Sequence, residues 1–361
     1  MTSGTAPAGA AAPGSVREPA GRRQLAPRRT FDVVCVGNAL TDHLAFASED
    51  LIGQLGLDPG GMTLVDIATT ERIEAVVGAG EQVPGGTVTN TAVGIASFGG
   101  RPAFIGAVAT DERGRRYAED LWAAGVHAAL QRFEHDPSGD EAATGRCFIV
   151  VTPDAERTMA TALGVGGRLD RDGLDEELIA SSRLVYFDGY VLDLPDAVAL
   201  VDRLVEVSRG AGTAIALGLS DAALVARHHA RLVELSGSAV DILFANESEA
   251  MALSGAGDVQ EALEQLRRPG LTVVVTCGPA GAVLASEDEV VTIPPDEVEV
   301  VVDRTGAGDL FAAGVCYGLT AGLSIERAGE LGALAAGEVI SHLGARPRTS
   351  LAELARRRGL L

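Results

Sequence analysis

A short glycine-containing segment near the C-terminus has the residue types that hold an anion beside a carboxylate. Residues 303–309 read Asp-Arg-Thr-Gly-Ala-Gly-Asp, follow an apolar run at 298–302 that predicts a strand, and precede a helical pattern. Small residues at 306–308 let a ligand approach the backbone, and unpaired N–H groups at a helix N-terminus attract anions. Asp309 falls in the first helical turn, where the dipole keeps a carboxylate ionised and able to accept a proton from a hydroxyl. The segment predicts an anion site beside a general base, although an N-capping acid after a glycine turn has the same pattern.

Two other segments place polar side chains where a hydroxylated ligand could bind. The double glycine Gly85-Gly86 precedes a predicted helix and permits close approach of a polyol, and Asn90 lies one turn into that helix. Residues 37–42 read Gly-Asn-Ala-Leu-Thr-Asp and follow the first predicted strand, at the sheet edge where α/β folds bind ligands. Asp42 can accept hydrogen bonds from two vicinal hydroxyls. A structural turn at the glycines and a capping role for Asp42 are the alternatives.

Composition excludes several classes of chemistry. The chain has 361 residues, and all 29 of its basic residues are arginine. Without lysine, neither a Walker A phosphate site nor a lysine Schiff base can form, so a bound phosphate must be met by backbone N–H groups, arginine or a metal ion. The formal net charge of −21 disfavours nucleic-acid binding. No apolar run reaches the roughly 18 residues of a membrane span, so we expect neither nucleic acid nor membrane as a partner.

The cysteines and the N-terminus indicate where the protein works and where its folded part begins. The four cysteines lie far apart, without the spacing typical of a metal site or a disulfide framework, so we expect a reduced, cytoplasmic setting. Residues 1–30 are rich in Ala, Gly, Pro and Arg, and they predict a disordered basic tail without the apolar stretch of a signal peptide. A transit peptide is the alternative for this tail. The folded domain is expected over 31–361.

Apolar runs of strand length alternate with helical patterns along that domain. Strands are predicted at 31–37, 103–109, 184–187, 214–217, 242–245 and 271–276. Helices are predicted at 88–98, 114–124, 308–321, 325–341 and 351–358. Near-continuous apolar strands predict a parallel sheet covered on both faces, followed by an antiparallel hairpin at 282–285 and 290–293. A second hairpin, 147–152 and 158–163 around a polar turn at 153–156, is inserted between the α/β units and predicts a lid.

Taken together, these segments resemble the PfkB or ribokinase family of carbohydrate and nucleoside kinases, over 31–346. The resemblance rests on the order and spacing of the 85–90 and 303–309 segments. Within the family it is to the adenosine kinase branch, through 37–42, 151–159 and 188–190. It implies an α/β fold, a ribokinase-like three-layer sandwich with a mostly parallel central sheet and a small β-sheet lid. The lid segments are expected at about 42–70 and 143–165.

The resemblance also implies roles for individual residues. Asp309 is expected to be the catalytic base, with an anion hole formed by Gly306, Ala307 and Gly308. The residues expected to bind the acceptor substrate are Asn38, Leu40, Asp42, Gly85, Gly86, Asn90 and Arg157. The residues expected to bind the nucleotide are Asn246, Thr276, Gly278, Gly281 and Thr305. Glu249 of the family's N-x-x-E motif is expected to organise Mg²⁺ through water.

The implied activity is ATP-dependent transfer of the γ-phosphate to a sugar or nucleoside hydroxyl. Adenosine 5′-OH, giving AMP, is the acceptor that the branch resemblance favours. Leu40, Phe148 and Met159 could furnish its purine pocket, and core packing accounts for these three residues equally well. A free sugar such as ribose is the alternative, and a non-catalytic nucleoside or sugar-binding protein is a third. ATP, Mg²⁺ and a monovalent cation such as K⁺ are the expected cofactors, and both monomer and homodimer occur in the family. Two departures stand out: Val88 is bulky enough to narrow the sugar pocket, and Arg304 replaces a small polar residue.

Overall fold

The computed structural model describes most of the chain after the N-terminal segment. The described residues are Met1, 29–46, 48–57, 61–78, 80–137, 139, 141–152 and 157–361. Nearly all of the predicted basic tail, and the predicted turn at 153–156, therefore lie outside the described residues. None of the helices in the described part of the chain combines the length and the apolar character that a membrane span needs.

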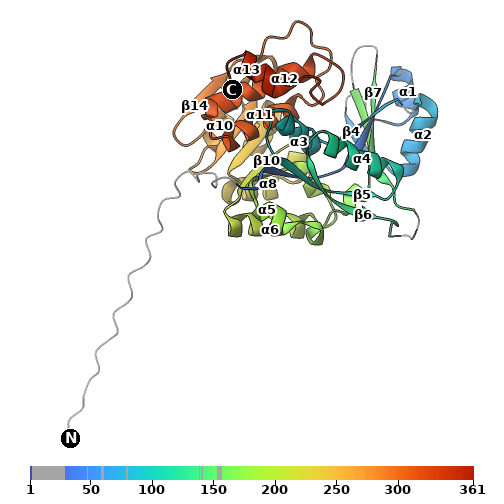
Figure 1. The fold of residues 1–361 in the computed structure, drawn as a ribbon, viewed down its shortest axis with the longest axis horizontal. Helices are drawn as coiled ribbons and strands as arrows, with labels where there is room; N and C mark the ends of the chain where they lie inside the picture. Colours follow the sequence, from blue (N-terminus) through green and yellow to red (C-terminus); the bar gives the residue numbers. More distant parts are fainter. Residues whose placement is uncertain are drawn as a thin grey trace.

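The larger of two sheets has nine strands and carries the core of the molecule (Figure 1). Its order is β14-β13-β12-β11-β10-β9-β1-β5-β6, and pairing is parallel from β6 to β12 and antiparallel at β13 and β14. The strands are β1 (Phe31–Val36), β5 (Pro102–Ala109), β6 (His127–Phe133), β9 (Ser182–Asp188), β10 (Ala214–Gly218), β11 (Ile242–Asn246), β12 (Thr272–Thr276), β13 (Ala282–Ala285) and β14 (Val290–Ile293). The six strands predicted between 31 and 276 and the hairpin at 282–293 are confirmed, and the edge strand β6 was not predicted.

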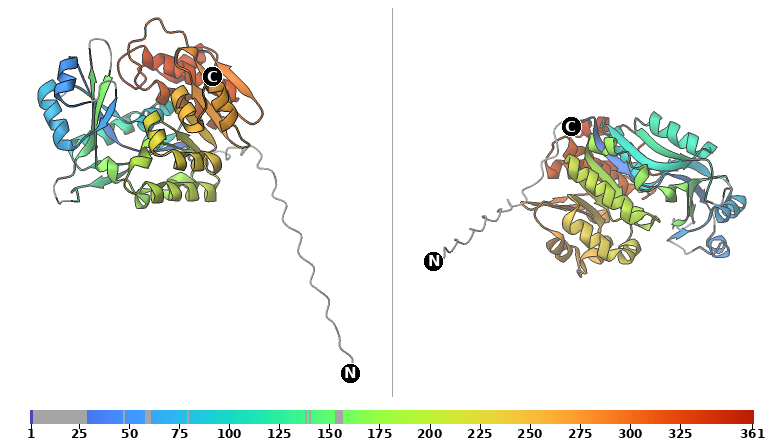
Figure 2. Two further views of the ribbon diagram at one scale, coloured as in Figure 1. Left: turned by 180° about the vertical axis from the view of Figure 1, so that it is seen from behind. Right: turned by 90° about the horizontal axis from the view of Figure 1, so that it is seen from below.

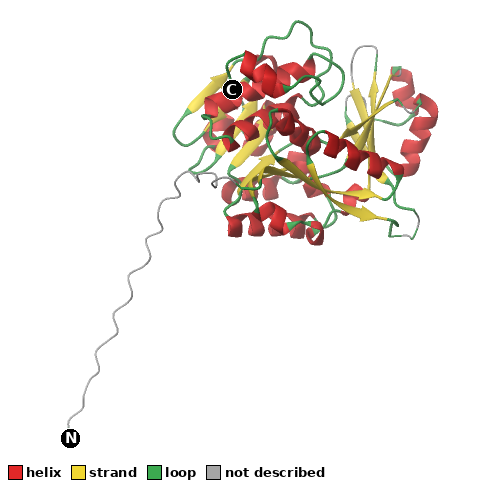
Figure 3. Cartoon of the chain, viewed as in Figure 1, coloured by secondary structure: helices red, strands yellow, loops and turns green. Residues whose placement is uncertain are grey.

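Helices cover both faces of this sheet because its strands are apolar on both sides (Figure 3). Along β1, Val33 and Cys35 enter one core, and Val34 and Val36 enter the other. The first core is covered by α3 (Thr87–Ser97), α4 (Glu112–Ala123), α11 (Ala307–Thr320), α12 (Ile325–Ile340) and α13 (Leu351–Arg357). The second is covered by α5 (Glu176–Ala180), α6 (Ala197–Ala211), α7 (Ala222–Arg227), α8 (His229–Ser238), α9 (Glu247–Ser254) and α10 (Val259–Leu266). The three-layer α/β architecture is the predicted one.

The smaller sheet has five strands and stands apart from the large sheet, with α1 and α2 on its outer face (Figure 2). Its order is β3 (Met62–Leu64), β8 (Arg157–Gly164), β7 (Thr144–Val151), β2 (Leu40–Phe46) and β4 (Glu81–Gly85). The outer helices are α1 (Glu49–Gln54) and α2 (Ile67–Val77). The predicted antiparallel hairpin of β7 and β8 is confirmed, and β4 joins the sheet from outside the two segments expected to form the lid.

The apolar run at 298–302 was predicted as a strand, and this prediction is wrong. The run has no helix or strand, and Val300 is 65% exposed. Its backbone follows two prolines and bonds to a helix end instead of a strand, since the N–H groups of Val302 and Asp303 both donate to Ile340 O. Val298 and Val301 line a cavity instead, which explains why the run is apolar.

Candidate active site

Three adjoining cavities follow the carboxyl edge of the large sheet, where ligands bind in open α/β folds. The inner cavity, of about 260 Å³, lies between the two sheets and is lined by Asn38, Asp42, Asn90, Asp188 and Asp309 among others. The middle cavity, of about 280 Å³, shares Thr87, Tyr190 and Asp309 with the inner one. The outer cavity, of about 380 Å³, shares Thr276, Gly308 and Phe311 with the middle one. Asp309 and Gly308 thus lie at successive junctions along one continuous path.

The inner cavity offers oxygen atoms that no protein group uses. The Oδ1 atoms of Asn38, Asn90 and Asp188 are buried, and none has a hydrogen-bond partner in the described part of the chain. All three residues line this cavity. Because buried polar atoms are nearly always hydrogen-bonded in a folded protein, these oxygens fit a ligand that brings hydroxyl donors.

The double glycine makes room for Asp42 rather than for the ligand alone. A Cβ atom on Gly85 would lie 2.0 Å from Asp42 Oδ2, so only glycine leaves space for the carboxylate. Gly86 has φ +99°, and a Cβ there would lie 2.6 Å from Asn38 O. The two glycines therefore fit β4 and the start of α3 against Asp42 and Asn38, two of the residues expected to bind the acceptor.

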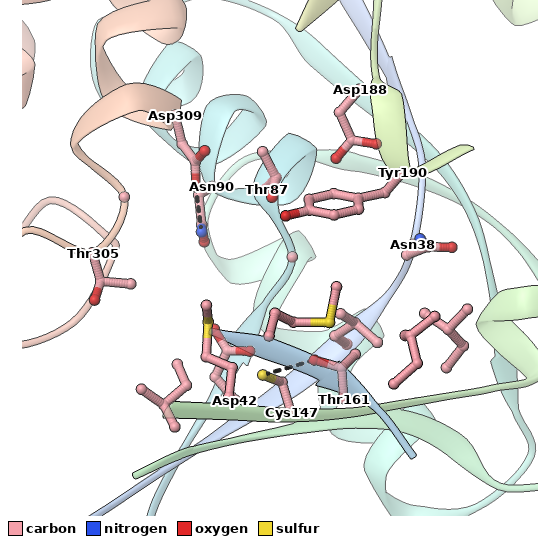
Figure 4. Close-up of a pocket in the computed structure, with 18 of the residues that line it drawn as sticks. Asn38, Asp42, Thr87, Asn90, Cys147, Thr161, Asp188, Tyr190, Thr305 and Asp309 are labelled. Carbon is pink, nitrogen blue, oxygen red and sulfur yellow. Dashed lines mark hydrogen bonds between the residues drawn. The ribbon is translucent and has the colours of Figure 1, made fainter. Parts of the chain in front are cut away.

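Asp309 is fixed by a helix that lies far away in the sequence. Asn90 Nδ2 on α3 donates to Asp309 Oδ2 over 2.9 Å, and Thr91 Oγ1 donates to the Asp309 carbonyl over 3.1 Å. Figure 4 shows the Asn90–Asp309 pair on one side of the inner cavity, with Asp188 and Tyr190 opposite and Asp42 on the smaller sheet below. The amide of Asn90 thus orients the predicted base, while its Oδ1 remains available to a ligand.

The turn before α11 leaves backbone N–H groups without helical acceptors at residues that line the cavities. Gly306 has φ +79°, and a Cβ there would lie 2.7 Å from Ala345 Cα, so this position requires glycine. The N–H of Leu310 makes the first bond of the helix, to Gly306 O. The N–H groups of Gly308 and Asp309 precede that bond and have no intrahelical acceptor. The N–H of Ala307, which was expected in the anion hole, instead donates to Arg304 O over 3.3 Å. A Cβ on Gly308 would meet no heavy atom within 4 Å, so the space beside these donors is open.

Carboxyl groups around the inner cavity have raised pKa values because of burial. Burial raises the pKa of Asp309 to about 6, although the hydrogen bond from Asn90 lowers it. Burial raises the pKa of Asp42 to about 7, opposed by the charge of Arg346 and reinforced by that of Asp309. Burial and the charge of Asp309 raise the pKa of Asp188 to about 7, against backbone hydrogen bonds that lower it. Burial of Asp309 thus outweighs the helix dipole that was expected to keep its carboxylate ionised.

The middle cavity contains the predicted N-x-x-E motif as a capping box. Asn246 Oδ1 accepts from Glu249 N over 2.9 Å, and the backbone N–H of Asn246 donates to Glu249 Oε2 over 2.9 Å. The side-chain Nδ2 of Asn246 also donates to Glu249 Oε1 over 2.7 Å. Burial raises the pKa of Glu249 to about 7. Among the described residues, no group of three or more His, Cys, Asp or Glu side chains could ligate a metal directly. The donor set therefore fits a cation held by one carboxylate, water and ligand oxygens, as Mg²⁺ is usually bound with phosphates.

The outer cavity combines glycine turns with an apolar wall. Gly278 and Gly281 lie on one side, and Val298, Val301 and Ile340 lie on another. Arg304 lines its rim and is exposed. The outer cavity therefore fits a ligand that has a flat apolar ring and a polar chain extending toward Gly308.

The structure places most of the predicted site residues on the path formed by the cavities. The inner cavity is lined by Asn38, Leu40, Asp42, Gly86, Asn90, Thr305, Gly306 and Asp309. The middle cavity is lined by Asn246, Thr276, Glu249, Gly308 and Asp309. The outer cavity is lined by Thr276, Gly278, Gly281, Ala307 and Gly308. Arg157 begins β8, and its side chain lies outside the described part.

Two predictions about the acceptor pocket are wrong. Phe148 is fully buried and packs with α1 and α2, because neighbouring residues of a strand face opposite sides of a sheet. Its neighbours Cys147 and Ile149 line the inner cavity instead. Val88 is also fully buried, lies against Gly37 and does not line the inner cavity, so it does not narrow it.

Other cavity residues were not among the predicted site residues. Asp188 ends β9 and Tyr190 follows it in η3 (Gly189–Asp193). A polar residue at the end of an apolar strand, the signal that singled out Asn38, would also have found Asp188. Arg346, in the loop after α12, lines none of these three cavities but a neighbouring one of about 220 Å³, which Asp42 and Asn90 also line. Arg346 donates to Asp120 and lowers the pKa of Asp42, and no local pattern marks it.

Comparisons with known proteins identify the family of this chain. Residues 32–351 match the pfkB family of carbohydrate kinases. The crystal structure of adenosine kinase from Sinorhizobium meliloti is 38% identical, with a TM-score of 0.85 over 91% of this chain and 99% of that one. A probable sugar kinase from Rhizobium etli is 36% identical, with a TM-score of 0.85 over 92% of this chain and 100% of the other. Adenosine kinase from Saccharomyces cerevisiae is 27% identical over 338 residues, 87% of this chain and 96% of the yeast protein. The chain belongs to the pfkB family of carbohydrate kinases, which are phosphotransferases that act on hydroxyl groups.

Proposed function

We propose that this protein transfers the γ-phosphate of ATP to the 5′-hydroxyl of adenosine, giving AMP. The observation that carries the proposal is the series of three cavities, with Asp309 at the junction of the inner and middle ones and Gly308 at the junction of the middle and outer ones. A nucleotide in the outer cavity extends its phosphates past Gly308, and an acceptor in the inner cavity presents its hydroxyl to Asp309.

The lining of the inner cavity supports a nucleoside as the acceptor. The unpartnered oxygens of Asn38 and Asn90, with the Asp42 carboxylate, suit the vicinal hydroxyls of a ribose. The smaller sheet adds an apolar wall that contains Leu40, Met62, Ile149 and Met159. Such a wall suits a purine and has no use in binding ribose alone, which favours adenosine over the free sugar.

The proposed chemistry is in-line transfer by positioned polar groups. The Asp309 carboxylate takes the proton of the acceptor hydroxyl, and the N–H groups of Gly308 and Asp309 stabilise the charge on the transferring phosphoryl group. The smaller sheet acts as a lid that excludes water. Glu249 holds Mg²⁺ through water, and the ion supplies charge neutralisation to the triphosphate. A monovalent cation such as K⁺ remains a prediction, and so does the reach of Arg157 into the site.

The raised pKa values predict opposite effects of pH on activity and on stability. We expect kcat/KM to rise between about pH 5 and pH 8 as Asp309 and Asp42 ionise, because their pKa values are about 6 and about 7. In an unfolded chain these carboxyls ionise near pH 4, so the ligand-free folded protein should lose stability between about pH 4 and pH 7. Urea unfolding of wild type and Asp42→Asn across this pH range checks the prediction. The variant lacks one of the buried carboxyls, so its free energy of unfolding should fall less as pH rises. Full activity at pH 5, or an equal loss of stability in both proteins, contradicts the raised pKa values of Asp309 and Asp42.

An acceptor panel tests the proposed substrate. We expect ADP release to depend on adenosine, with a higher kcat/KM than for ribose or fructose, and the product to be AMP. Activity on ribose without activity on nucleosides would establish the free-sugar alternative. ATP hydrolysis that no acceptor stimulates would favour a binding protein.

The apolar wall can be tested with two variants of one strand. Ile149→Ala removes a side chain that lines the inner cavity, whereas Val150→Ala alters the opposite face against α1 and α2. Loss of about 1 to 2 kcal/mol of apolar contact should raise KM for adenosine roughly 10-fold in the first variant and leave it unchanged in the second. Equal KM values for the two variants would argue against a purine at this wall.

A further inference from the structure

The middle cavity contains no cationic side chain in the described part of the chain, although the proposed function passes a phosphoryl group through it. The whole sequence lacks lysine, and the lining residues of this cavity include no arginine. Its side-chain donors are hydroxyls and one amide, from Thr87, Tyr186, Tyr190, Ser220, Thr276 and Asn246. Kinases commonly place a lysine or arginine against the transferring group. The side chains of this cavity can therefore offer the phosphoryl group only neutral donors.

Tyr190 has the position that such a donor requires. Only Thr87, Tyr190 and Asp309 are shared by the described linings of the inner and middle cavities, so Tyr190 lies where acceptor and phosphoryl donor meet. In Figure 4 the hydroxyl end of its ring points toward Thr87, on the side of Asp309 and Asn90. No hydrogen bond occupies this hydroxyl among the described residues.

The backbone that carries Tyr190 is fixed by tight packing. A Cβ on the preceding Gly189 would lie 2.7 Å from Leu224 Cδ2 and 2.8 Å from Leu219 O. The N–H of Gly189 donates to Ser220 Oγ over 3.2 Å, and Ser220 has a positive φ of 70°. Strained backbone of this kind is concentrated at functional sites, and here it anchors the start of η3 beside the middle cavity.

We propose that Tyr190 is a catalytic residue whose hydroxyl donates a hydrogen bond to an oxygen of the phosphoryl group as it passes from ATP to the acceptor. This inference rests on the proposed function and adds a residue to it. The phenol stays protonated, because burial and then the charges of Asp188, Asp221, Asp309 and Glu249 raise its pKa. A guanidinium in the same place would face those carboxylates, lower the pKa of Asp309 and weaken the base. A phenol stabilises phosphoryl charge without that effect.

Tyr190→Phe tests the proposal, because it removes one oxygen and retains the ring. We expect kcat to fall roughly 10- to 100-fold, the usual effect of losing a hydrogen bond to a charged group, with KM for ATP and acceptor changed less than about two-fold. Affinity for a transition-state mimic, ADP with aluminium fluoride and acceptor, should fall by a similar factor in calorimetry, while affinity for ADP alone is retained. Tyr317→Phe is the matched control, since Tyr317 stacks on Phe98 at 5.1 Å outside the three cavities.

The outcomes separate this inference from the proposed function. A wild-type protein that phosphorylates no alcohol refutes the proposed function. Wild-type turnover with unchanged kcat and unchanged mimic affinity in Tyr190→Phe overturns the role of Tyr190 alone. A rise in acceptor KM without loss of kcat also overturns it, because Tyr190 would then only hold the acceptor.

Discussion

Replacement of Asp309 by Asn should lower kcat by about 10³- to 10⁴-fold, the contribution expected of a positioned general base. Asparagine cannot take the proton of the acceptor hydroxyl at neutral pH. Its side-chain oxygen can still accept the hydrogen bond that Asn90 Nδ2 gives to Asp309 Oδ2, so α3 and α11 should remain joined. A coupled ADP-release assay with saturating ATP and adenosine measures the effect.

The control for this variant is another carboxylate in a first helical turn. Glu326 occupies the first turn of α12 and is exposed, so Glu326→Gln should keep wild-type kcat and stability. ATP affinity of Asp309→Asn should change little, because the N–H groups and the outer cavity are retained. Turnover within about ten-fold of wild type would show that another group takes the proton and would remove the central element of the proposed mechanism.

The sequence was sufficient to predict those parts of the fold and site that depend on neighbours along the chain. Asp309 could be placed in a first helical turn because three small residues precede it and an apolar helical pattern follows. The strands could be found because a parallel sheet covered on both faces requires near-continuous apolar runs. Asn38 follows from the same logic, since it comes just after the carboxyl end of such a strand, whereas Asn246 was expected only from the family resemblance.

Contacts between distant segments could not be predicted in this way. Asn90 and Asp309 are 219 residues apart, and nothing local to either shows that the Asn90 amide is directed at the base. The assignment of Phe148 failed because the hairpin pattern does not reveal which face of β7 meets α1 and α2. The prediction of a strand at 298–302 failed because an apolar cavity wall and a strand can have the same composition. Gly85 was predicted to admit a ligand, but its missing side chain makes room for Asp42. The sequence could not show this, because only the pairing of β2 and β4 brings the two residues together.

Two glycine-to-alanine variants should separate what the turn does for folding from what it does for the ligand. In Gly306→Ala, the added methyl would overlap Ala345 at a residue with φ +79°. Strain and overpacking together should lower the free energy of unfolding by about 2 to 5 kcal/mol. In Gly308→Ala, the methyl meets nothing within 4 Å, so the free energy of unfolding should stay at the wild-type value.

The activities of the two variants should diverge from their stabilities. Gly308 lines both the middle and outer cavities, so its methyl group would hold phosphate away from the N–H donors. We expect kcat/KM to fall about 100-fold, as when one donor to a transition-state anion is lost, in a protein that unfolds at the wild-type urea concentration. Gly210→Ala on α6, where a Cβ also meets nothing within 4 Å, is the matched control and should retain full activity. If Gly308→Ala keeps wild-type kcat/KM, phosphate does not approach this helix end, because a methyl group there could not be accommodated beside it.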